Sequence, residues 1–195
     1  MSNDPASVSD ELEPVVLELG KALFICQCFE GTLVLLLSTI SYEEADMEES
    51  AFTAAVELFS QKTLGQLLKR LKEKIEPPEK MNEYFTSGWS NRNWIVHEFL
   101  HCTVHDLSSP KGRLETIGKL VEAKQQVKRA DIVANRVLDM YLKKYGLSVA
   151  AVLDTLFQLH TPESREALFE LSDDPRVGTR YRGHIREYLT IVPPP

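Results

Sequence analysis

The sequence predicts an all-α protein, a helical bundle with a small helical C-terminal extension. Residues 15–76, 79–109 and 111–161 contain no proline, and the 195-residue chain holds only 9 glycines. Such long stretches without breakers exclude a turn-rich all-β fold. Apolar residues also recur at steps of three and four through these stretches, as in helices that bury one face. With 43% hydrophobic and 26% charged residues, the composition is that of a globular protein.

The first expected helix covers about residues 8–41, with Pro14 near its start, where proline is tolerated. Its predicted core positions are Val15, Val16, Leu19, Leu23, Cys26, Phe29, Leu33, Leu36 and Ile40. The apolar segment 22–40 is about as long as a membrane span, which needs roughly 20 residues. Gln27 and Glu30 lie near its middle, where a charge would be costly in lipid. We therefore expect a core helix in a cytoplasmic protein with no membrane contact.

The remaining elements follow in order. Helices are expected over residues 51–60, 64–75, 79–107 and 113–145, with a kink near Gly88 in the third of these. Pro77 and Pro78 end the helix over 64–75, because proline disfavours helical backbone in the residue before it. Residues 8–145 would then form the bundle. Residues 146–195 would form the extension, with short helices over 149–160 and 162–171 and a tail.

Charge and cysteine content restrict the function classes. The formal net charge of −7 disfavours a general nucleic-acid coat, which needs a basic surface, but leaves room for a local site. The three cysteines, Cys26, Cys28 and Cys102, lie in apolar helical patterns. They are typical of reduced core residues in the cytoplasm, whereas a disulfide framework needs an even number. A metal site at Cys26 and Cys28 is a weaker alternative.

The segment Trp89–His101 contains most of the chemical information. Asn93 and His97 are four residues apart and would share a helix face. Arg92 would lie about 140° from His97 at about 100° per residue, so we expect the pair to flank a groove rather than to stack. The expected core side consists of Ile95, Val96, Phe99 and Cys102. Arginine can hold a phosphate bidentately and histidine can transfer a proton, so the pattern indicates phosphate chemistry.

In this setting, Arg92-Asn93-x3-His97 resembles the R-x4–6-H motif of the HEPN superfamily (higher eukaryotes and prokaryotes nucleotide-binding domains). That family is an all-α up-and-down bundle with the motif late in the domain, after a long apolar helix, so the resemblance extends over residues 8–145. It implies a metal-independent endoribonuclease without a cofactor, whose composite site forms between two facing copies in a homodimer. It also implies an RNA substrate and a toxin–antitoxin or defence setting, in which an antitoxin or other regulatory protein restrains the enzyme.

The resemblance further implies a role for each residue. His97 would transfer a proton at the ribose 2′-hydroxyl, and Arg92 would stabilise charge on the scissile phosphate. Asn93 would orient the substrate or His97, and cleavage would leave a 2′,3′-cyclic phosphate and a 5′-hydroxyl. Glu30 is a supporting candidate, because an acid in an apolar helix needs a partner, for which we expect Arg92. His101 is a second supporting candidate.

Two other function classes stay open. In the first, the protein is a catalytically inactive helical interaction or regulatory protein, and the same residues form a structural polar cluster. In the second, His97 and His101 belong to an H-E-x-x-H motif, whose histidines bind zinc and whose glutamate acts as a general base in peptidases. Candidates for a third zinc ligand are His105, Glu115 and Glu122. The glycine of the longer peptidase motif is replaced by Val104, and no strand is expected upstream.

Overall fold

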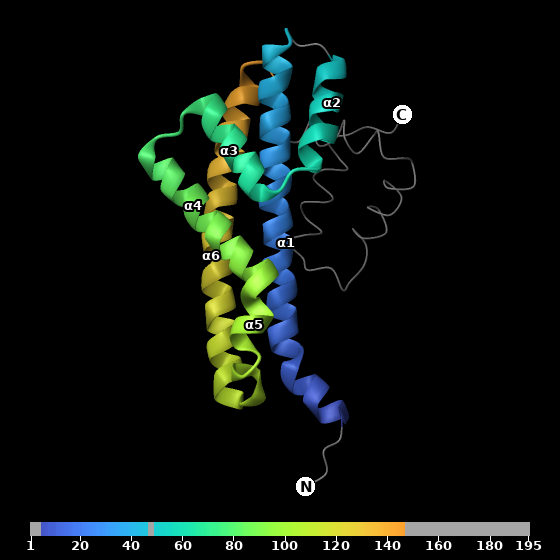
Figure 1. The fold of residues 1–195 in the computed structure, drawn as a ribbon, viewed down its shortest axis with the longest axis vertical. Coiled ribbons are helices and arrows are strands. Elements are labelled where there is room, and N and C mark those ends of the chain that lie inside the picture. The colour runs from blue at the N-terminus through green and yellow to red at the C-terminus, as the bar shows by residue number, and fades with distance from the viewer. Residues whose placement is uncertain (1–4, 47–48, 147–195) are drawn as a thin grey trace. The chain divides into compact units, whose positions relative to one another are not determined.

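The computed structural model describes residues 5–46 and 49–146, and within these ranges every regular element is a helix, as predicted (Figure 1). The packing described below belongs to the compact unit that ends at Tyr141. The predicted helices over 149–160 and 162–171, and the rest of the extension after residue 146, lie outside the described residues.

The order of elements agrees with the prediction except in one segment. The helices are α1 (Pro5–Glu44), α2 (Glu49–Ser60), α3 (Leu64–Ile75), α4 (Glu79–Asn93), α5 (Phe99–Thr103) and α6 (Pro110–Lys143). A five-residue π-helix, η1 (Trp94–Glu98), joins α4 to α5, and a 3-10 turn, η2 (Asp106–Ser108), precedes α6. The single helix predicted over 79–107 is therefore wrong: it is interrupted at η1 and ends at Thr103.

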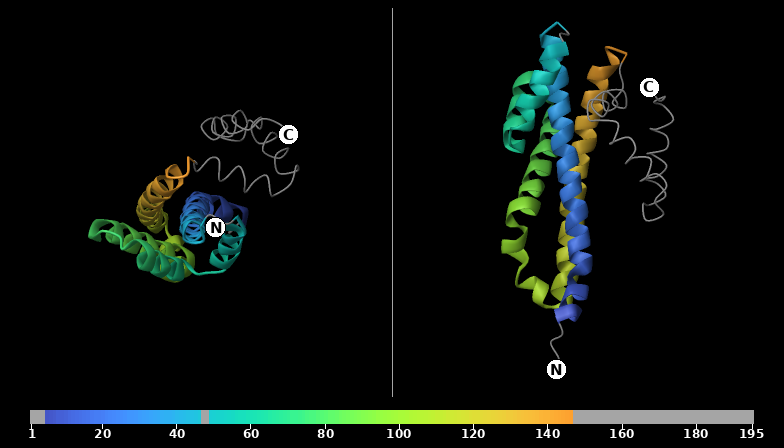
Figure 2. Two further views of the ribbon diagram at one scale, coloured as in Figure 1. Left: turned by 90° about the horizontal axis from the view of Figure 1, so that it is seen from above. Right: turned by 90° about the vertical axis from the view of Figure 1, so that its right-hand side faces the viewer.

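Helices α1 and α6 lie side by side and run in the same direction along the bundle (Figures 1 and 2). Ion pairs join them near their N-terminal ends, where Arg113 of α6 meets Glu11 of α1 at 2.6 Å. Further along, Lys124 of α6 pairs with Glu18, which is 8% exposed. The hydrogen bond from Lys124 lowers the pKa of the Glu18 carboxyl, so the pair holds the two helices together while that carboxyl is ionised.

One stripe of α1 forms the centre of the core. Its fully buried residues include Ala22, Phe29, Leu33 and Leu36, each with no exposed surface. Val16 and Leu23, predicted as core, are instead 64% and 36% exposed. Val16 lies on the other side of α1, where residues of α1 and α6 line an open groove of about 840 Å³. The length and composition of α1 would also suit a membrane span, but half of its most apolar window is buried in the bundle.

Helix α1 begins earlier than predicted, so Pro14 lies in its interior. Proline lacks a backbone N–H there and removes one helical hydrogen bond. Helices α2 and α3 both pack on α1. Helix α3 starts with a capping box, in which the Thr63 side chain accepts from the Gln66 backbone and Gln66 bonds back. The spacing predicts an apolar side of Leu64, Leu67, Leu68, Leu71 and Ile75; the four leucines are buried, and Ile75 at the end of the helix is only half-buried.

Helix α4 comes closest to the core at Gly88. A Cβ at this position would lie 2.4 Å from the Cβ of Ala130 on α6 and 3.4 Å from Phe29 on α1. The ring of Phe29 stacks on Phe85 of α4, with centroids 6.3 Å apart. Gly88 is therefore a close-packing position between three helices. The kink predicted there is wrong, since α4 continues through Gly88 to Asn93.

We expect Gly88→Ala to lower the free energy of unfolding by about 1–3 kcal/mol, because the added methyl group overpacks a rigid contact. Gly118→Ala is the matched control, since a Cβ there meets nothing within 4 Å in the middle of α6. This control should raise the free energy of unfolding by about 0.5–1 kcal/mol through helix propensity. Urea denaturation measures both; equal effects in the two variants would contradict the packing described.

A buried polar cluster links the middle of α1 to α6. Thr32 Oγ1 lies 2.7 Å from Asp131 Oδ1, and the Asn135 amide donates to both residues at 3.0–3.2 Å. Burial raises the pKa of the Asp131 carboxyl from its usual 3.8, and the hydrogen bond from Thr32 opposes this change. Ionised Asp131 therefore costs stability in the folded state, and protonation relieves that cost as the pH falls through the raised pKa.

Asp131→Asn should accordingly raise the thermal midpoint at pH 7, where the wild-type carboxyl carries its charge. The advantage should shrink as the pH falls through the raised pKa of the folded state, and it should vanish only well below the unfolded-state pKa of about 3.9, where both states of the wild type are protonated. Thermal unfolding followed by circular dichroism from pH 7 to pH 3.5 measures this difference. A constant difference across that range would show that the charge of Asp131 is not the cause.

Candidate functional site

The π-helix η1 is the local feature that shapes the site. It contains Ile95 and Val96, β-branched residues whose helix propensity is modest. Ile95 is 2% exposed and Phe99 3% exposed, so both face the core as predicted. Trp94 packs edge-on against Phe99, with ring centroids 5.7 Å apart. These contacts hold η1 against the bundle. Val96 and Cys102, predicted for the core side, are exposed.

The guanidinium of Arg92 is the centre of a polar cluster formed with three other residues. Its Nε donates to Glu30 Oε1 of α1 at 2.6 Å. Its Nη1 donates to Asn93 Oδ1 at 3.3 Å and lies 2.9 Å from His97 Nε2. Three of the predicted site residues, Arg92, Asn93 and His97, are thus in contact, and the predicted pairing of Glu30 with Arg92 is confirmed.

The contact between Arg92 and His97 corrects the sequence-based geometry. On an α-helix, positions five residues apart lie about 140° apart and their side chains diverge. A π-helix forms hydrogen bonds from residue i to residue i+5 and so uses one more residue in a turn. Five positions then complete about one turn, which places His97 next to Arg92. The predicted arrangement, a pair that flanks a groove rather than stacking, is corrected for this reason: the two side chains meet at 2.9 Å.

The contact also fixes the tautomer of His97. A guanidinium carries only donors, so the facing Nε2 must accept and cannot carry a proton. Neutral His97 therefore has its proton on Nδ1 and a basic lone pair on Nε2. The side chains of Arg92 and Glu30 are 17% and 33% exposed, and His97 is exposed. The remaining nitrogen of Arg92, Nη2, has no hydrogen-bond partner among the described residues and is free to hold an anion.

Cys26 lies beneath this cluster, one turn before Glu30, and is 2% exposed. Burial raises the pKa of its thiol to about 11, although the charge of Arg92 opposes that shift. The thiol is therefore uncharged and forms an apolar surface beneath the cluster. Burial also raises the pKa of Cys28, with the negative charge of Asp131 as a further cause. The two cysteines therefore face different neighbours and do not form one ligand set.

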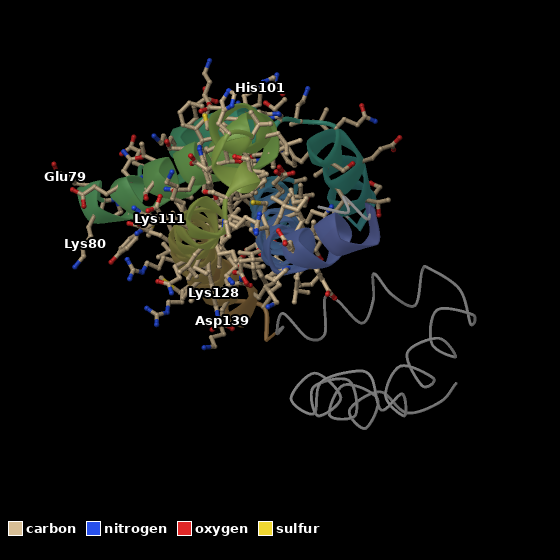
Figure 3. All side chains as sticks on the ribbon, turned by 90° about the horizontal axis from the view of Figure 1, so that it is seen from below. Glu79, Lys80, His101, Lys111, Lys128 and Asp139 are labelled. Atoms are coloured by element: carbon tan, nitrogen blue, oxygen red, sulfur yellow. The ribbon has the colours of Figure 1, made fainter. Side chains whose placement is uncertain are left out.

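His101 is separate from the cluster. It is exposed on α5, labelled in Figure 3, and makes no hydrogen bond to the residues around Arg92. Within residues 5–46 and 49–146, no three His, Cys, Asp or Glu side chains are placed to hold a metal ion. The zinc alternative thus has no third ligand in the described part of the chain. The positive charge of Arg92 next to His97 would also repel a cation there.

The sequence-based set of site residues omits Trp89. This side chain is 41% exposed and lies on α4 one turn before Arg92. Its spacing from Arg92 and Asn93 could have indicated it, since residues three and four apart on a helix are neighbours. An aromatic residue in an apolar pattern is ordinarily a core residue, which is why spacing alone did not single it out.

No family model matches this chain, and neither curated proteins nor solved structures provide a match. The functional assignment therefore depends on the geometry of the Arg92 cluster and on the sequence motif.

A double-mutant cycle of Arg92→Gln and Glu30→Gln should give a coupling free energy of about 1–3 kcal/mol, because this pair is largely shielded from water. The control is the exposed pair Arg70–Glu73 on α3, whose atoms lie 3.0 Å apart with about half of each side chain exposed. Exposed pairs contribute only about 0.2–1 kcal/mol. Chemical denaturation of the wild type and the six variants measures both couplings, and a smaller value for Arg92 and Glu30 would argue against a structural link.

Proposed function

We propose that this chain is a metal-independent endoribonuclease of the HEPN type, acting on RNA in the cytoplasm as a homodimer. The observation that supports this most is the 2.9 Å contact between Arg92 Nη1 and His97 Nε2. It pairs a fixed positive charge with a basic nitrogen at an accessible position, and no metal is needed for either role. Glu30 holds the guanidinium from the other side.

The proposed reaction uses these groups in one displacement. His97 Nε2 leaves Arg92 and takes the proton of the ribose 2′-hydroxyl, and the 2′-oxygen attacks phosphorus. The bond from phosphorus to the 5′-oxygen breaks, and that oxygen takes a proton from the His97 imidazolium of the facing copy. Arg92 stabilises the charge that builds up on the phosphate, through Nη1 and the free Nη2. The products are a 2′,3′-cyclic phosphate and a 5′-hydroxyl.

A second copy would cover the apolar residues beside the site. Val96, Leu100 and Val104 are 38%, 65% and 56% exposed and lie four residues apart, on the same segment as His97. A two-fold interface uses the same patch on both subunits, so a dimer through this stripe would bring two His97 side chains together. A toxin–antitoxin or defence role follows if an antitoxin or other regulatory protein covers the same stripe.

One observation favours the competing function, an inactive interaction or regulatory protein. The Nε and Nη1 groups of Arg92 already have acceptors within the chain, in Glu30, Asn93 and His97. Such an internal network is also what a purely structural cluster would show. Catalysis requires that RNA displaces at least the contact to His97.

The purified full chain should cleave a single-stranded RNA in the presence of EDTA. His97→Ala should lower the rate by about 100-fold or more, since it removes the general base. His105→Ala is the control, because His105 is exposed after α5 and outside the cluster. Gel electrophoresis gives the rate, and mass spectrometry should find a 2′,3′-cyclic phosphate.

Each alternative result has a defined meaning. Loss of cleavage on chelation, with recovery on adding zinc, would contradict the metal-independent mechanism. An RNA whose 2′-hydroxyls are replaced by hydrogen should be resistant, and its cleavage would rule out attack by the 2′-oxygen. A folded dimer that leaves all RNA intact would support the inactive interaction protein.

A further inference from the structure

Trp89 of α4 lies against α3 at Gly65. Its indole Nε1 lies 3.4 Å from the position that a Cβ on Gly65 would occupy, and Cε2 lies at 3.8 Å. These are van der Waals contact distances, so the edge of the indole that carries Nε1 packs beside Gly65. It remains 41% exposed, and its N–H has no partner among the described residues. The chain's other tryptophan, Trp94, is instead packed against Phe99.

The indole is also next to the proposed catalytic cluster. Arg92 and Asn93 follow Trp89 by three and four residues on the continuous helix α4. Side chains at these spacings are neighbours on a helix surface, with Cβ atoms about 5–6 Å apart. A planar group stacked on Trp89 would therefore lie one helical turn from a phosphate held by Arg92.

Two lysines of α3 lie on the helix face that Trp89 contacts at Gly65. Lys69 and Lys72 lie four and seven residues after Gly65, and therefore on the same face of the helix. Both are exposed and have no partner among the described residues. The nearby acid, Glu73, is neutralised by Arg70 at 3.0 Å. With a rise of about 1.5 Å per residue, the two lysines lie about 6 and 10 Å along α3 from the indole.

We infer that Trp89 is a stacking platform for one base of single-stranded RNA, and that Lys69 and Lys72 hold the phosphates that flank this base. Every base has a π-face, so stacking selects unpaired strands with little preference for sequence. Bases within a duplex are already stacked on their neighbours and cannot use the platform. This inference depends on the proposed ribonuclease function for its biological meaning, but RNA binding can be measured without cleavage.

The first experiment uses the full chain carrying His97→Ala and Trp94→Phe, which prevents cleavage and leaves Trp89 as the only tryptophan. Titration with a 12-nucleotide oligouridine should quench the fluorescence of Trp89. Trp89→Ala in the His97→Ala background should weaken binding by at least about fivefold, measured by fluorescence anisotropy of a labelled oligouridine. Trp89→Phe should retain most of the affinity, because it keeps an aromatic face.

Phe24→Ala is the matched control, since Phe24 is an aromatic residue of α1 that is 53% exposed far from the Arg92 motif in sequence. It should leave the affinity unchanged. Unchanged affinity in Trp89→Ala, or equal binding of a hairpin duplex, would overturn the stacking role. Trp89-dependent binding of a polyglutamate peptide with no binding of oligouridine would overturn it in favour of a protein partner.

The lysines are tested through the salt dependence of binding. For single strands, each neutralised phosphate contributes about −0.7 to the slope of log Kobs against log salt concentration. The double variant Lys69→Gln, Lys72→Gln should therefore make the slope less steep by about 1.4. The control double variant, Lys111→Gln with Lys128→Gln on α6, should leave it unchanged. Equal slopes in both would overturn the proposed phosphate path.

The two proposals fail in different ways. If oligouridine binds through Trp89 but wild-type protein cleaves no RNA, the stacking site stands and the ribonuclease function fails. If wild-type protein cleaves RNA and Trp89→Ala leaves KM unchanged, the ribonuclease function stands and the platform is overturned.

Discussion

The site depends on how one guanidinium is held. Arg92 bonds to Glu30 on α1 and to His97 in η1, and so joins the first long helix to the segment that follows α4. Two constraints bring these residues together. Gly88 lets α4 approach α1 and α6 closely, and the π-helix then turns His97 back toward Arg92. Without the close approach, Glu30 would not reach the guanidinium; without the π-helix, His97 would point elsewhere.

The π-helix is a deviation from regular structure at the residues with the most chemistry. An interrupted helix gives up regular hydrogen bonds, and π-turns occur frequently at functional sites. Here the interruption is held by the buried side chains of Ile95 and Phe99 on one side and leaves His97 exposed on the other. The local packing thus stabilises an arrangement in which a basic nitrogen faces an arginine. That arrangement suits phosphate chemistry better than the binding of a cation.

Much of the fold could be predicted from the sequence, because helical periodicity and breakers are local signals. The boundaries of the helix Leu64–Ile75 and its buried leucines follow directly from spacing and from Pro77 and Pro78. The partnership of Glu30 with Arg92 followed from a chemical need, since an acid in an apolar helix requires a counter-charge. The first kind of prediction succeeds because it uses one element at a time, and the second because a buried charge restricts the choice of partner.

The errors concern properties that several elements decide together. Val16 and Leu23 have helical spacing like the core residues, but no described element covers their side of α1. In the sequence, Gly88 predicts a kink; in the structure, Ala130 of another helix lies opposite Gly88, which is a close-packing position. The π-helix cannot be predicted from the α-helical spacing of apolar residues, because the number of residues per turn changes over its five residues. The contact between Trp89 and Gly65 joins two helices, so neither helix alone reveals it.

The most direct test is the tautomer of His97, because the proposed general base is an unprotonated Nε2 that accepts a hydrogen bond from Arg92 before substrate binds. Nitrogen-15 NMR of the imidazole ring distinguishes the two neutral tautomers. The structure predicts the proton on Nδ1 in neutral His97, with Nε2 accepting a hydrogen bond that disappears in Arg92→Gln. A proton found on Nε2 of neutral His97, or ring signals that do not respond to Arg92→Gln, would contradict the account.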